Sequence, residues 1–123
     1  MKYLLLGYTP ARDWDAATAD APTPEALAAF AAYRELEREL LQSGELVSSE
    51  GLGHPAVSTT VRRGEKGVVA TDGPFVELKE VLASFAVIDV SNHERAVEIA
   101  SRIVEALGEP VEIRSIMGAD FAA

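Results

Sequence analysis

Two short runs of the chain, residues 3–6 and 85–88, are apolar at successive positions. A strand with one wet face alternates apolar and polar residues, whereas continuous apolar runs are typical of strands buried on both faces. These runs therefore predict the central strands of a sheet that is covered on both sides. Two helical patterns, near residues 24–43 and 92–107, can cover one side only, so the second face needs another partner.

Both predicted helices have start and stop signals. Thr23 precedes a proline and predicts an N-cap, and Gly44 predicts the end of the first helix. Ser91 and Glu94 match a capping box for the second helix, which Gly108 should end. The first helix is expected to bury a broad apolar face made of Ala26, Ala29, Phe30, Tyr33, Leu36, Leu40 and Leu41.

The order of the predicted elements fixes the fold class. Between and around the helices we expect strands at residues 2–8, 45–49, 82–90 and 111–117, and a polar hairpin made of residues 57–63 and 68–71. This order predicts an α+β chain, a ferredoxin-like βαββαβ domain with an inserted β-hairpin. Right-handed crossovers put both helices on one face of the sheet, so a second copy is the simplest cover for the other face. We therefore expect a homodimer.

Composition narrows the class of partner. The chain has 123 residues, a length that favours a single domain over residues 1–123, and 48% of them are hydrophobic. A net charge of −9 repels phosphate backbones, so we expect no nucleic-acid partner. The absence of cysteine excludes disulfides and thiolate metal sites. No apolar run is long enough for a membrane span or a signal peptide, so a cytoplasmic location is expected.

The segment Thr71, Asp72, Gly73, Pro74 and Phe75 resembles the DGPF signature of the YCII-related proteins. The resemblance extends over nearly the whole chain, because it includes the opening residues 1–6, the stretch from Gly51 to Arg62 and the closing residues 111–114. It implies a dimeric α+β barrel, in which two ferredoxin-like sheets pack face to face. Members are similar to small-molecule enzymes of the same architecture, such as muconolactone isomerase, and some occur beside extracytoplasmic-function sigma factors. A histidine and aspartate pair assigned in the family is not intact, because Tyr33 stands at the histidine position.

Four residues are candidates for acid and base chemistry. Asp72 ends a predicted strand and is either a turn carboxylate or a general base. Tyr33 and Glu37 lie one helical turn apart on an apolar face, where Glu37 needs a partner or an edge position. His54, in a loop, is either solvated or a base oriented by a carboxylate. These catalytic candidates are expected to converge on the barrel cavity.

Four further residues are candidates for substrate binding. Lys79 and Arg62 can bind an anionic group, as can Arg114 on the last strand, and Trp14 can cover a pocket or simply pack. With two histidines and no cysteine, no metal site is expected, and no glycine-rich loop points to a nucleotide cofactor.

The sequence leaves two functions open. The first is binding or conversion of a small metabolite in the cavity of the dimer. The alternative is a non-catalytic interaction or regulatory module, associated in some relatives with a sigma factor. A cavity that holds at least two converging ionisable groups favours the first function.

Overall fold

The computed structural model describes residues 1–12 and 23–118. In chain order its elements are β1 (Lys2–Pro10), α2 (Pro24–Ser43), β2 (Leu46–Gly51), the 3₁₀ turn η1 (Pro55–Val57), β3 (Thr59–Gly64), β4 (Gly67–Asp72), β5 (Glu80–Asp89), α3 (His93–Leu107) and β6 (Val111–Ser115). The predicted element order is confirmed, with boundaries that agree or differ by at most two residues.

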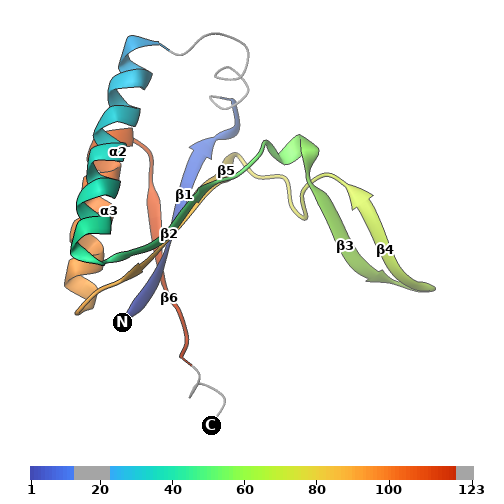
Figure 1. Ribbon diagram of the computed structural model, residues 1–123. Helices are drawn as coiled ribbons and strands as arrows, with labels where there is room; N and C mark the ends of the chain where they lie inside the picture. Colours follow the sequence, from blue (N-terminus) through green and yellow to red (C-terminus); the bar gives the residue numbers. More distant parts are fainter. Residues whose placement is uncertain (13–22, 119–123) are drawn as a thin grey trace.

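In the described part of the chain, four strands form an antiparallel sheet in the order β2-β5-β1-β6. β1 lies in the middle, where Lys2 pairs with Asp89 of β5 and Tyr3 pairs with Ser115 of β6. Both helices cover the same face of this sheet, as the sequence predicts (Figure 1). The architecture is α+β and agrees with a ferredoxin-like fold.

The core lies between the helices and the sheet. Tyr3 and Leu5 point into it from β1, and Ile88 of β5 and Ile99 of α3 are completely buried. Alternation along β1 sends these side chains toward the helices and their neighbours toward the opposite face. The other buried members of the core are Leu36, Leu40, Ala86, Val90, Ala96, Ala100 and Ile103.

Helix ends largely follow the predicted signals. The Thr23 hydroxyl accepts a hydrogen bond from the Ala26 amide at 3.0 Å, and Gly44 ends α2 in the left-handed region at φ 79°. The predicted cap of the second helix is wrong by one residue. Asn92, not Ser91, is the N-cap, because its side-chain oxygen accepts from the Arg95 amide at 2.8 Å.

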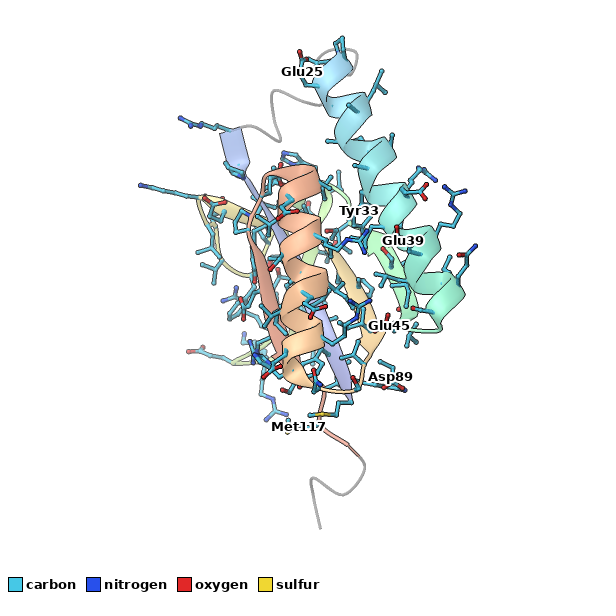
Figure 2. The ribbon with its side chains drawn as sticks, turned by 90° about the vertical axis from the view of Figure 1, so that its left-hand side faces the viewer. Glu25, Tyr33, Glu39, Glu45, Asp89 and Met117 are labelled. Atoms are coloured by element: carbon cyan, nitrogen blue, oxygen red, sulfur yellow. The ribbon has the colours of Figure 1, made fainter. Side chains whose placement is uncertain are left out.

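The buried face of α2 is narrower than predicted. Leu36 and Leu40 are buried, but Phe30 and Leu41 are 58% and 63% exposed. The physical reason is that α2 extends past α3 at its Glu25 end, so its first turns have less to pack against (Figure 2). Leu41 follows Leu40 by one hundred degrees of helical rotation and leaves the core-facing stripe.

A bidentate ion pair ties the start of α3 to the turn after α2. Arg95 donates through Nε to Glu45 Oε2 at 2.8 Å and through Nη2 to Glu45 Oε1 at 2.9 Å. Its remaining Nη1 binds Glu98 at 2.9 Å. These bonds hold the pKa of Glu45 at about 2, well below its ordinary 4.5, with burial acting in the opposite direction. The pair therefore fixes α3 against the end of α2.

β3 and β4 form a separate two-stranded hairpin, in which Thr59 pairs with Asp72 and Arg62 with Val69. We call this hairpin the arm. It projects from the sheet on the side opposite the helices (Figure 1). No other element of the described chain packs extensively on it. The predicted inserted hairpin is thus confirmed.

None of the helices within residues 1–12 and 23–118 has the length and apolar character needed to cross a membrane.

Candidate functional site

The sheet face opposite the helices, here called the open face, carries the clearest concentration of functional groups. Its central side chains are Leu4, Leu6 and Tyr8 of β1 together with Leu82, Phe85 and Val87 of β5, and most of them are half-buried. They alternate with the core residues Tyr3 and Leu5, so they point away from the helices. The open face is therefore an apolar floor without a covering helix in the described chain (Figure 1).

A polar cluster stands at the β6 edge of the open face. The Tyr8 phenol donates a hydrogen bond to Glu112 Oε1 at 3.3 Å, and Arg114 Nη1 binds Glu112 Oε2 at 3.3 Å. Burial raises the pKa of Tyr8, and the charge and hydrogen bond of Glu112 raise it further. The cluster thus holds a neutral phenol, a carboxylate and a guanidinium side by side.

Sequence reasoning missed Tyr8 and Glu112, although it named Arg114. A signal was present for Tyr8, because it continues the alternation of Leu4 and Leu6 as a polar aromatic. Glu112 gives no such signal. Its meeting with Tyr8 depends on the register that pairs β1 with β6 across 104 residues.

The turn that follows the arm is held by its own backbone. The Gly73 amide donates to the Ser58 carbonyl at 2.7 Å, and the Thr60 hydroxyl donates to the Gly73 carbonyl at 2.7 Å. Gly73 has φ 105°, which side chains rarely adopt. The Asp72 carboxylate is exposed and makes no hydrogen bond or ion pair with the rest of the described chain.

Arg62 lies in the arm, with its guanidinium 5.2 Å from the centre of the Phe75 ring. This cation–π contact links β3 to the turn after β4. It leaves Phe75 71% exposed, an unusual state for a large aromatic side chain. Arg62 is thus placed beside the turn that carries Asp72.

Tyr33 and Glu37 lie on α2, on the helix side of the sheet. The Tyr33 hydroxyl and the Ser49 Oγ are hydrogen-bonded at 3.0 Å. Burial raises the pKa of Tyr33, the Ser49 hydrogen bond partly lowers it, and the nearby Glu37 charge raises it. The hydrogen-bond partner of the Tyr33 hydroxyl is therefore Ser49, which the sequence did not indicate, while Glu37 is half-buried at the edge of the apolar stripe.

His54 caps the short turn η1. Its Nδ1 accepts a hydrogen bond from the Ala56 amide at 3.0 Å. Lys79 is exposed, and its carbonyl accepts from the Ala11 amide at 2.7 Å. Trp14 lies outside the described residues.

Within one chain, the structure brings Tyr33 together with Glu37 but not with Asp72. α2 and the arm stand on opposite sides of the sheet (Figure 1). Arg62 and Asp72 share the arm, and Arg114 joins Tyr8 and Glu112 on the open face.

Two surface hollows lie away from the predicted catalytic residues. One, of about 290 Å³, is a groove between α2 and α3 beside Leu36 and Arg102. The other, of about 500 Å³, lies beside Met1, Tyr3 and Met117. In the part of the chain that the structure describes, no three histidine, aspartate or glutamate side chains gather as a metal site would require.

Comparison with known proteins gives one family. No curated protein matches the chain. The family model of the YCII-related domain matches residues 1–119, nearly the whole length and including the Asp72 to Phe75 turn, the arm and the open face. The chain therefore belongs to the YCII-related domain family.

Proposed function

We propose that the protein binds or converts a small metabolite by acid and base chemistry, in a cavity formed between the open faces of two copies. The observation that carries this proposal is the Tyr8, Glu112 and Arg114 cluster at the edge of an apolar floor. Ligand sites commonly combine an apolar lining with a few polar groups that orient the ligand. A metabolite with a hydroxyl or carbonyl group is the expected ligand.

The three groups of the cluster have complementary chemical roles. The neutral Tyr8 phenol can donate a hydrogen bond or a proton to a ligand oxygen. Glu112 can accept the proton of a ligand hydroxyl, and Arg114 forms an ion pair with this carboxylate. Cover by a second copy would exclude water and strengthen each of these interactions.

The residues selected from the sequence enter the proposal at different places. Asp72 and Arg62 belong to the arm, from which they can reach a cavity between copies. Tyr33, Glu37 and His54 lie nearer the helix side or the η1 turn, so their catalytic role requires a ligand there. Lys79 and Trp14 remain predicted substrate-binding residues.

The test removes a tyrosine hydroxyl on each side of the sheet, at Tyr8 and at Tyr33, and compares the two effects on ligand binding. Native mass spectrometry of the purified protein would first identify a molecule that co-purifies, and its affinity would then be measured by calorimetry. Tyr8→Phe is expected to weaken binding about tenfold, the effect of losing one hydrogen bond of roughly 1.4 kcal/mol. Tyr33→Phe is the matched control and should leave the affinity unchanged.

The opposite result would place the ligand on the other side of the sheet. If Tyr33→Phe weakens binding and Tyr8→Phe does not, the ligand lies on the helix side near Ser49. In the same assay, Asp72→Asn distinguishes a role of Asp72 in the turn from a role in ligand binding, because asparagine preserves much of the turn and removes the charge.

A second candidate function is a non-catalytic interaction module, as some relatives suggest through sigma-factor association. The exposed apolar side chains of the arm favour it, since such surfaces mark protein contacts. A pull-down with a sigma factor would support this reading only if Val61→Glu in the arm abolished it.

A further inference from the structure

We propose that the arm of one protomer packs on the open face of the other and supplies Arg63 to the cavity there, so that each site takes residues from both chains. This inference deepens the proposed function, on which it rests. It states that a second copy of the chain covers the open face and that Arg63 of that copy is the cation in the site.

The arm lacks cover of its own. Val61, Val68 and Phe75 are 61%, 75% and 71% exposed, and no body element packs extensively on β3 or β4. An isolated two-stranded hairpin is marginal in water, so an apolar arm needs a surface to pack on. Hydrogen bonds from Gly73 and Thr60 nevertheless hold the two ends of the hairpin together at its base.

The position and length of the arm allow it to pack on the open face of a second copy. Both lie on the side of the sheet that faces away from the helices (Figure 1). Strands of six residues span about 20 Å, while a four-stranded sheet is about 15 Å across. In a two-fold dimer, each arm is thus long enough to cross the open face of the other copy.

Charge favours the same occupant. The arm carries three of the eleven basic residues and two of the twenty acids, so it is positive while the rest of the chain is strongly acidic. The β2 edge of the open face is acidic, because Glu50 pairs with Phe85 there, whereas Glu112 at the β6 edge is matched by Arg114. A basic, apolar arm fits this surface, and nucleic acid does not.

One face of the arm is the better candidate for contact. Val61 and Arg63 lie two positions apart on β3 and so point to the same face, and Arg63 pairs with Val68. These three side chains therefore share a face of the arm. The opposite face carries Arg62, which is occupied by Phe75. The contact face therefore brings Arg63, with two valines as its apolar anchor, toward the acidic edge of the other copy.

The test uses the lack of native cysteine. A nitroxide on Val68→Cys would be attached to an unlabelled chain, which is mixed with a ¹⁵N-labelled chain. Amides of β1 and β5 near Leu6 and Phe85 should lose most of their intensity. A nitroxide on Val97→Cys, on the exposed side of α3, should leave them intact. No loss, or loss confined to α2 and α3, would overturn the proposal.

A second measurement covers the energetics. Val61→Glu should raise the dissociation constant of the dimer at least about tenfold, because it places a charge in an apolar contact. Val97→Glu is the control and should not change it. If Val61→Glu dimerises like the wild type in sedimentation, the arm is not the contact.

These results can fail independently of the proposed function. If the arm makes no contact with the second copy but ligand binding still depends on Tyr8, the arm proposal is wrong and the ligand site lies on one sheet. Arm contacts without any Tyr8-dependent ligand would leave an assembled dimer and overturn the small-molecule proposal.

Discussion

Tyr8 donates its phenolic hydrogen to Glu112 across the β1 and β6 pair, at 3.3 Å on the open face. The two residues are 104 positions apart in sequence, yet they form a hydrogen bond on that face. Glu112 also binds Arg114, so a change at this carboxylate should be felt by both neighbours.

Burial raises the pKa of Tyr8 most, and the charge of Glu112 raises it further. Glu112→Gln removes the negative charge that opposes ionisation, so the pKa of Tyr8 should fall toward its ordinary value. Ultraviolet titration of tyrosinate measures this change, with Tyr8→Phe identifying the signal of Tyr8. Glu105→Gln, on α3, is the control, and an unchanged Tyr8 pKa in Glu112→Gln would contradict the described geometry.

The ion pair of Glu45 and Arg95 should make the free energy of unfolding depend on pH in the acid range. Because folding lowers the pKa of Glu45 from 4.5 to about 2, its contribution is fully present above 4.5 and is lost as the pH falls toward 2. Glu45→Gln should cost about 1–2 kcal/mol at neutral pH, after allowance for solvent screening. Urea unfolding should show this difference shrinking between pH 4.5 and 2.

The exposed neighbour of the same arginine provides the control. Glu98 is 64% exposed, so Glu98→Gln should cost less than about 0.5 kcal/mol. Equal effects of the two substitutions would show that the partly buried bidentate contact contributes no more stability than the exposed one.

The core between helices and sheet should be sensitive to cavities. Ile99→Ala removes a completely buried side chain and should destabilise the fold by about 3–4 kcal/mol. Val97→Ala, on the outer side of the same helix, should cost less than about 1 kcal/mol. Chemical denaturation of both variants measures the ratio, and similar losses would contradict the assigned helix face.

The role of His54 can be separated into a cap and a base. Asparagine can also accept from the Ala56 amide, so His54→Asn should retain stability within about 0.5 kcal/mol, whereas His54→Ala should lose about 1 kcal/mol. Thermal unfolding measures both. If His54→Asn also keeps ligand affinity, the imidazole acts only as a cap.

Much of the fold follows from local chemistry that the sequence displays. Thr23 and Gly44 begin and end α2 because a hydroxyl cap and a left-handed glycine suit those positions. The Ser91 prediction failed because Asn92 offers an equally good side-chain acceptor one residue later. Such adjacent caps compete within a single turn, and pattern alone does not choose between them.

The candidate site was less accessible to prediction. Asp72 and Tyr33 stand out by motif and by helical spacing, but nothing local indicates that they lie on opposite sides of a sheet (Figure 1). Tyr8 and Glu112 meet through strand register, which is a property of the whole fold. Contacts of this kind are set by long-range pairing, whereas sequence periodicity reports only local faces.

The position of β1 has a consequence for how the chain is made. Among the strands of the sheet it is synthesised before the others, but its two neighbours are β5 and β6, whose paired residues lie as much as 112 positions later. During translation β1 must therefore wait, unpaired, until nearly all of the sheet has left the ribosome. The α2 helix, with its local caps, can form meanwhile, so we expect the nascent chain to acquire helix early and its central sheet last.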